Sequence, residues 1–168
     1  KHPMAFMVAP THALMQGTKG GKAKLVTMAQ LSEQRILVRE RGSGTRATIE
    51  RLFKDAGLPL RIGSEMSSNE AIKHMCAAGF GVAFLSMHTC VLEMEAGVLA
   101  LLPMEHNPIE RDWYVMHLAS RQLPQVALAF ERFLVERGQG EIRRQLAAKP
   151  AAKKTARRAK RTVRPSGR

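Results

Sequence analysis

Short strand-like segments recur along the first two thirds of the chain, and each is followed by polar or glycine-rich residues. The clearest, residues 81–86, is an unbroken apolar run of the kind found in strands buried on both faces of a parallel sheet. Around Trp113, polar and apolar residues alternate, as they do in a half-buried strand. The pattern predicts strands at residues 4–9, 35–39, 60–65, 81–86, 98–102 and 110–117.

Between these segments, apolar residues recur three and four positions apart, as they do on one face of a helix. Ile49, Leu52 and Phe53 form one such stripe. The spacing predicts helices at residues 45–56, 69–78, 87–96 and 124–137, with a short helical turn at 27–31. Glycine follows each of the four longer helices, where helices commonly end: Gly57, Gly79, Gly97 and Gly138. Strands separated by helices predict an α/β domain with a mostly parallel sheet and flanking helices.

Composition changes this picture at one end of the chain. The 168 residues are 45% hydrophobic, which is enough to bury a core, and the net charge is +13. Nine of the 27 Lys and Arg residues lie in residues 149–168, which contain no Asp or Glu. We therefore expect residues 141–168 to be a basic, disordered tail. The polar loop at residues 16–24 is expected to be mobile, and the first residue, Lys1, suggests a piece of a longer protein.

Two predicted helices begin with hydroxyl-rich segments, directly after successive strands. Residues 42–46 read Gly-Ser-Gly-Thr-Arg, and residues 67–70 read Ser-Ser-Asn-Glu. Ligands of parallel α/β sheets bind beyond the carboxyl ends of the strands, where unpaired backbone N–H groups of helix starts favour anions. Glycine lets the backbone approach a ligand closely, and Arg46 could add a bidentate contact to a carboxylate or phosphate.

A plain structural interpretation of the same residues stays open. Serine and threonine are common N-caps, so Ser43, Thr45, Ser67 and Ser68 could serve only to start their helices. Ser67 and Glu70 also match the S-x-x-E spacing of a capping box.

Other chemistry finds little support in the pattern. The histidines lack metal-ligand spacing, no acid and base pair is evident, and the G-x-S-x-G turn of serine hydrolases is absent. Cys76 and Cys90 lie in apolar stripes and are expected to be reduced core thiols. No apolar run is long enough for a membrane helix. We therefore expect no enzyme activity, no metal and no cofactor, and a cytoplasmic location.

Four segments in the right order resemble a known family. They are residues 38–46, 67–73, 78–86 and 109–117. Together they are similar to the effector-binding domain of LysR-type transcriptional regulators, and most similar to the regulators of Calvin-cycle (RuBisCO) operons.

The resemblance implies a periplasmic-binding-protein-like (type 2) fold, in which two subdomains flank a metabolite cleft. Residues 1–108 would form the second subdomain, and residues 109–140 would supply a strand and helix that return to the first, whose N-terminal part is missing from this chain. The matching cleft residues would be Ser43, Gly44, Thr45, Arg46, Ser67 and Asn69.

The same resemblance implies partners. The effector would be a small anionic metabolite, with phosphoenolpyruvate, a sugar phosphate and NADPH as candidates. DNA would be bound through a missing N-terminal winged helix-turn-helix, and the protein would form a homodimer or homotetramer. The positive charge of residues 149–168, and not the resemblance, suggests that this basic tail helps by contacting DNA phosphates; a tail that is only solvated is the alternative. Two alternatives remain: a solute-binding protein, which would carry an export signal, and an anion-using enzyme of the same fold.

Overall fold

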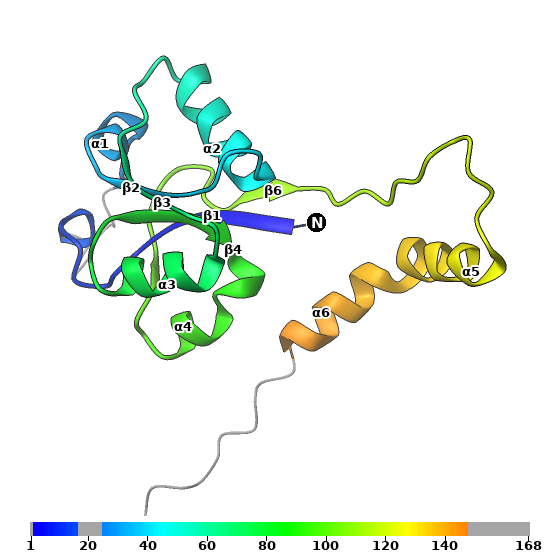
Figure 1. Cartoon of the computed structure of the whole chain (residues 1–168). Coiled ribbons are helices and arrows are strands. Elements are labelled where there is room, and N and C mark those ends of the chain that lie inside the picture. Colours follow the sequence, from blue (N-terminus) through cyan, green and yellow to red (C-terminus); the bar gives the residue numbers. More distant parts are fainter. Residues whose placement is uncertain (1, 17–24, 148–168) are drawn as a thin grey trace, which may run out of the picture. The chain divides into compact units, whose positions relative to one another are not determined.

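The computed structural model describes residues 2–16 and 25–147 and divides the chain into two compact units, Lys1–Met116 and His117–Arg168 (Figure 1). Nearly all of the loop predicted at residues 16–24, and the tail from residue 148 onward, lie outside the described residues.

Within its described residues, the first unit is built on a six-stranded mixed sheet. The strands are β1 (His2–Val8), β2 (Ile36–Arg39), β3 (Ile62–Met66), β4 (Val82–Ser86), β5 (Ala100–Leu101) and β6 (Ile109–Arg111). Their order is β3-β2-β4-β1-β5, and β6 pairs with β1. β2 is parallel to β3 and β4, whereas β1 is antiparallel to β4, β5 and β6. The sequence predicted a mostly parallel sheet, whereas the sheet is mixed because β1 runs antiparallel to its three neighbours. Periodicity could not reveal this, because it reports the burial of a strand and not the direction of its neighbour.

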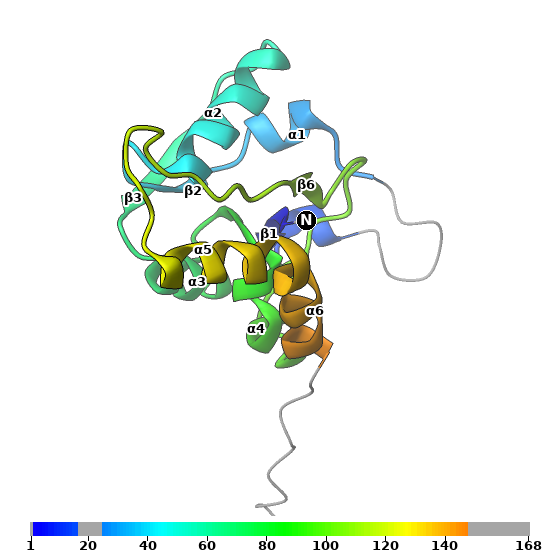
Figure 2. The same ribbon diagram turned by 90° about the vertical axis from the view of Figure 1, so that its right-hand side faces the viewer.

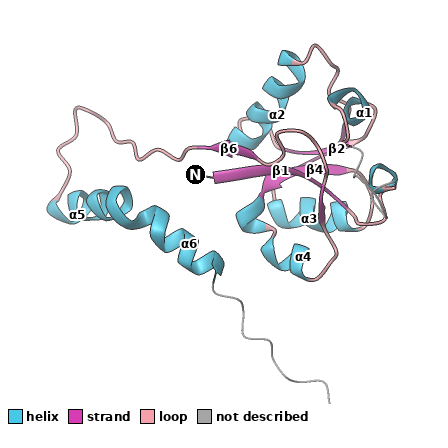
Figure 3. Ribbon diagram, turned by 180° about the vertical axis from the view of Figure 1, so that it is seen from behind, coloured by secondary structure: helices cyan, strands magenta, loops and turns pink. Residues whose placement is uncertain are grey.

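Helices cover both faces of this sheet (Figures 2 and 3). They are α1 (Met28–Ser32), α2 (Gly44–Asp55), α3 (Asn69–Ala77) and α4 (Val91–Glu95), with 3-10 turns η1 (Ala13–Met15) and η2 (Met87–Thr89). α1 and α2 pack on one face, and α3 and α4 on the other. In place of the single helix predicted at residues 87–96, the structure has the 3-10 turn η2 followed by the short helix α4.

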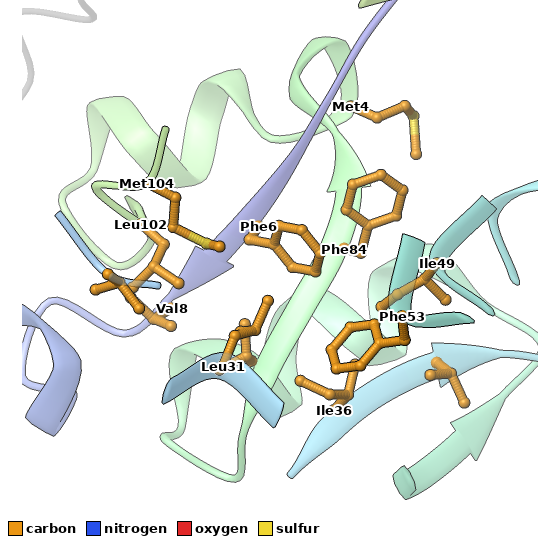
Figure 4. Packing of buried hydrophobic residues seen from close by; sticks show 13 residues of the cluster. Met4, Phe6, Val8, Leu31, Ile36, Ile49, Phe53, Phe84, Leu102 and Met104 are labelled. Carbon is orange, nitrogen blue, oxygen red and sulfur yellow. The ribbon is translucent and has the colours of Figure 1, made fainter. Parts of the chain in front are cut away.

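The core has two layers because side chains alternate across each strand. Phe6 and Phe84 lie on the face covered by α2, with ring centroids 4.8 Å apart, and Ile49 and Phe53 of α2 pack against the same cluster (Figure 4). On the other face, Met7, Leu85, Ile72 and Cys76 form the second cluster. The two clusters fix how α2 and α3 are placed over the sheet.

Glycine ends three helices as the sequence predicts. Gly57, Gly79 and Gly97 have φ values of 66°, 83° and 69°, the left-handed conformation that favours glycine. Gly138 is different: it has no positive φ, and helical structure continues past it.

The last predicted elements therefore need correction. In the second unit, α5 (Gln125–Phe133) is followed by the π-helical turn η3 (Leu134–Gly138) and by α6 (Gln139–Ala147). The prediction that a disordered tail begins at residue 141 is wrong for residues 141–147.

The strand predicted at residues 110–117 is also shorter than expected. Only Ile109–Arg111 pairs, with β1 of the first unit, and the compact unit ends after Met116. Trp113, Tyr114 and Met116 are exposed. A strand needs a hydrogen-bonded neighbour, and among the described residues β1 is paired with β6 only as far as Arg111.

Candidate functional site

The carboxyl ends of β2 and β3 lie side by side, so the two hydroxyl-rich helix starts open at the same edge of the sheet. Arg39 pairs with Met66 in the parallel register, and the Glu40 N–H donates to the Met66 carbonyl at 3.1 Å. The loop that leads into α2 and the loop that leads into α3 therefore begin next to each other. This is the adjacency that the order of strands and helices predicted.

At the start of α2, Ser43 is the N-cap. Its Oγ accepts a hydrogen bond from the Thr45 N–H at 3.3 Å, so the capping interpretation is confirmed for Ser43, whose hydroxyl proton is still able to donate. The Thr45 hydroxyl takes part in no hydrogen bond within the described residues. A side-chain carbon at Gly44 would meet no atom within 4 Å, so packing does not require glycine there.

Arg46 has a different role from the one predicted. It is only 4% exposed, and its Nη1 donates to the Arg39 carbonyl at 3.0 Å. Nη1 also lies 3.0 Å from Oε2 of Glu65, and Nε lies 2.6 Å from Oε1 of Glu50. Two carboxylates already balance the charge of Arg46, so its guanidinium is poorly suited to the predicted bidentate contact with an anion. Arg46 instead ties α2 to the ends of β2 and β3.

At the start of α3, the capping residue is Ser68 and not Ser67. The Ser68 Oγ accepts from the Ala71 N–H at 3.4 Å. The capping box from Ser67 to Glu70 does not form, because Ser67 lies before the N-cap; Glu70 instead pairs with Nζ of Lys73 at 2.8 Å. Ser67 is exposed, and within the described residues its hydroxyl makes no hydrogen bond.

Arg39 is the residue at this edge that the sequence interpretation missed. Its Nη1 donates to Oδ1 of Asn69 at 2.7 Å, which joins the end of β2 to the start of α3. Its Nε and Nη2 contact the two carboxylate oxygens of Glu40 at 2.7 and 2.8 Å. The hydrogen bond to Glu40 raises the pKa of Arg39, and the same bond lowers the pKa of Glu40. The signal available in the sequence was a charged residue at the end of an apolar strand.

A third arginine reaches the same edge from β6. Arg111 pairs with His2 in the sheet, and its Nη1 donates to the Gly44 carbonyl at 3.4 Å. The first turn of α2 is thus next to the end of β6, which lies far from it in the sequence.

Across the part of the chain that the structure describes, no group of three or more His, Cys, Asp or Glu side chains could hold a metal ion. Cys76 and Cys90 are free and buried, as expected of core thiols. Among residues 2–16 and 25–147, no helix is long and apolar enough to cross a membrane.

A mixed sheet flanked by helices, with a polar edge between successive helix starts, defines an α/β ligand-binding domain. Residues 1–139 match the model of the LysR substrate binding domain. The chain belongs to this family, as its motifs indicated.

The particular relatives are regulators. CbbR of Rhodospirillum rubrum, an HTH-type transcriptional regulator, is 41% identical over 134 residues, which is 79% of this chain and 42% of that protein. The RuBisCO operon transcriptional regulator of Allochromatium vinosum is 35% identical over 80% of this chain and 42% of that protein. The chain thus spans about two fifths of the length of these relatives.

Solved structures share the fold. The regulatory domain of CcmR from Synechocystis PCC6803, in complex with 2-PG, is 33% identical with a TM-score of 0.69, covering 79% of this chain and 61% of that one. The effector binding domain of QuiR, in complex with shikimate, has a TM-score of 0.68, covering 83% of this chain and 63% of that one. At 17% identity, QuiR supports the fold alone.

Proposed function

We propose that this chain is the metabolite-sensing part of a LysR-type transcription regulator that controls carbon-fixation genes. One observation carries the proposal: two helix starts open side by side at the carboxyl edge of parallel strands, and each offers a hydroxyl, on Thr45 and Ser67, that no other described residue uses. The names of the RuBisCO-operon relatives and the 2-PG complex of CcmR support the choice of function.

The ligand in this proposal is a small anionic metabolite. The first turn of each helix has backbone N–H groups without intrahelical acceptors and a partial positive charge, which together favour a phosphate or carboxylate. Ser43, Gly44 and Thr45 would contact the ligand from α2, and Ser67 and Asn69 from α3. Phosphoenolpyruvate, a sugar phosphate, NADPH and 2-PG all carry suitable groups.

In this site Arg46 and Arg39 are positioning residues. Arg46 joins α2 to the ends of β2 and β3, and Arg39 joins β2 to Asn69. Both arginines therefore set the distance between the two helix starts without touching the ligand. The affinity for the ligand depends on that distance.

The wider role follows the family. The ligand would favour one arrangement of two subdomains, of which residues 1–108 form the second and residues 109–140 contribute a strand and helix to the first. A shift of this kind requires different affinities for the two arrangements. DNA would be bound by a winged helix-turn-helix elsewhere in the full protein, which would be a cytoplasmic homodimer or homotetramer without enzyme activity.

The site can be tested on this chain by NMR. Addition of phosphoenolpyruvate, and of 2-PG in a parallel titration, is expected to shift the amide signals of Gly44, Thr45, Ser67 and Asn69 in a saturable way. Thr45→Val and Ser67→Ala should each weaken binding by roughly 10-fold to 100-fold, because a hydrogen bond to a charged group contributes about 1.5–3 kcal/mol.

A matched control lies one turn further along the same helix. Thr48→Val makes the same change, but the Thr48 hydroxyl already donates to the Gly44 carbonyl at 2.8 Å. It should bind as the unmodified chain does. Shifts confined to other parts of the sheet, or equal affinities for Thr45→Val and Thr48→Val, would argue against the site.

The basic tail is proposed to assist DNA binding through phosphate contacts without sequence preference. Deletion of residues 149–168 from the full regulator should weaken its binding to DNA and reduce the dependence of that binding on salt. An unchanged salt dependence would assign the tail no part in DNA contact.

A further inference from the structure

Three buried polar atoms without hydrogen-bond partners gather where β1 and β4 reach the same edge of the sheet. They are Nδ1 of His2, Oγ of Ser86 and Nε2 of His88. Met4 pairs with Ser86, the last residue of β4, and η2, which contains His88, follows directly. The two imidazole rings lie with their centroids 5.5 Å apart.

Ser86 points to the face of the sheet that α2 covers. Side chains alternate along a strand, and Phe84, two residues earlier, packs in the cluster under α2. Ser86 is 8% exposed, so its unpaired hydroxyl is removed from bulk water. The same edge holds the start of α2, where Arg111 contacts the Gly44 carbonyl.

Trp113 covers the two imidazoles. Its ring centroid lies 4.5 Å from that of His2 and 6.3 Å from that of His88. Burial lowers the pKa of His2, and the charges of His88 and Arg111 lower it further. An imidazole ring and a serine hydroxyl can each donate a hydrogen bond.

Unpaired buried polar atoms destabilise a fold, because their lost contact with water is not compensated. Three of them in one cluster indicate a group that binds there. In the described residues no third His, Cys, Asp or Glu joins the histidines as a metal ligand. Arg111 and the positive end of α2 instead favour negative charge.

We propose that His2, Ser86 and His88 form an oxyanion-binding subsite under Trp113, for a carboxylate or phosphate group. The inference rests on the proposed function for the source of that group: it is the second acidic group of a metabolite whose first acidic group lies at the starts of α2 and α3. The ligand class is therefore a small acid with two anionic groups.

Trp113 is the one tryptophan in the sequence, so its fluorescence reports on the subsite directly. Titrations with inorganic phosphate, acetate and phosphoenolpyruvate at constant ionic strength are expected to give saturable changes. Phosphoenolpyruvate carries both a phosphate and a carboxylate, so it should bind more tightly than either single-group probe. The two single-group titrations show which group the subsite prefers.

Ser86→Ala and His88→Asn should each weaken these responses by about tenfold or more, as expected for loss of a hydrogen bond to an anion. His106→Asn, at an exposed loop histidine, is the matched control and should leave them unchanged. Ser86→Ala should also leave the melting temperature of the free protein unchanged or raise it, since it removes an unsatisfied hydroxyl. A purely structural serine would give a lower melting temperature.

The two proposals can fail separately. If Thr45→Val weakens phosphoenolpyruvate binding but Ser86→Ala and His88→Asn do not, the subsite is wrong and the main site stands. If the phosphate and acetate responses depend on Ser86 while Thr45→Val has no effect on phosphoenolpyruvate, the subsite stands and the main site is wrong. A tryptophan signal that does not saturate with any probe overturns the subsite.

Discussion

Asn107 should stabilise the first unit far more than its position in a loop suggests. Met7 of β1 pairs with Leu101 of β5, and Met4 of β1 pairs with Ile109 of β6. Phe6 lies between these two pairings and has no strand partner among the described residues on this edge of β1. Asn107 completes the hydrogen bonding there.

Three hydrogen bonds of one amide side chain fill this gap. Oδ1 accepts from the Phe6 N–H at 3.0 Å, and Nδ2 donates to the Phe6 and Leu102 carbonyls at 3.2 and 2.7 Å. The Phe6 carbonyl also accepts from the Leu102 N–H at 3.0 Å, so it keeps one partner if Asn107 is truncated. The Phe6 N–H and the Leu102 carbonyl would lose their hydrogen-bond partner. Both belong to buried residues, since Phe6 is 2% exposed and Leu102 is 0% exposed.

Asn107→Ala is therefore expected to lower the free energy of unfolding by about 3 kcal/mol, since a net hydrogen bond contributes about 1 kcal/mol and an orphaned buried group costs about 1–3 kcal/mol. For a unit of this size the melting temperature should fall by roughly 10 °C. Urea unfolding followed by circular dichroism would measure the change, with an unaltered slope against urea concentration.

Two further variants make the reasoning specific. Asn107→Asp keeps an acceptor for the Phe6 N–H but turns a carboxylate oxygen toward two carbonyls, so at neutral pH it should destabilise at least as much as alanine. Asn69→Ala, which removes an asparagine with one partly buried hydrogen bond, should cost less than about 1 kcal/mol. A cost below about 1 kcal/mol for Asn107→Ala would refute the argument.

Three other outcomes are expected. Arg46→Met should lower the free energy of unfolding by about 1–2 kcal/mol in urea titrations, a modest loss because the side chains of Glu50 and Glu65 stay 51% and 44% exposed, whereas no loss would contradict the positioning role. Burial lowers the pKa of His12, whose Nδ1 accepts a hydrogen bond from the Leu14 N–H at 3.2 Å. The neutral His12 side chain therefore stabilises the fold above the unfolded pKa of about 6.5, and this stabilisation is lost as pH falls toward the lower pKa of the folded state. Between pH 7 and pH 5 the melting temperature should therefore fall more steeply for the unmodified chain than for His12→Asn. An equal fall in both proteins would exclude His12 as the cause. Burial raises the pKa of the Cys76 thiol to about 12, so a thiol reagent at pH 8 should label it only in urea, and rapid labelling of the folded protein would contradict this.

Local signals predicted most of the secondary structure. Gly57, Gly79 and Gly97 follow their helices in the left-handed conformation because a helix end is decided within a few residues. Gly138 carries the same local signal, yet helical structure runs on to Ala147. Its failure shows that glycine permits a helix to end without requiring it to.

The candidate site divides in the same way. The adjacency of the two helix starts could be predicted, because consecutive βα units of a parallel sheet point the same way. The partners of Arg46 could not, because Glu65 lies on a different strand and only packing brings it to α2. The choice of Ser68 over Ser67 as N-cap also escaped prediction, because both residues have the same hydroxyl and differ only in backbone position.

The amino-acid sequence by itself determined the family, the order of strands and helices, and the two hydroxyl-rich segments, since periodicity, glycine and short motifs act over a few residues. Tertiary structure alone decided that β1 runs against its neighbours, that Arg46 and Arg39 hold the loops, and that His2, Ser86, His88 and Trp113 meet at one edge. These contacts join residues distant in the chain, and their partners are selected by which side chains the sheet register brings within reach.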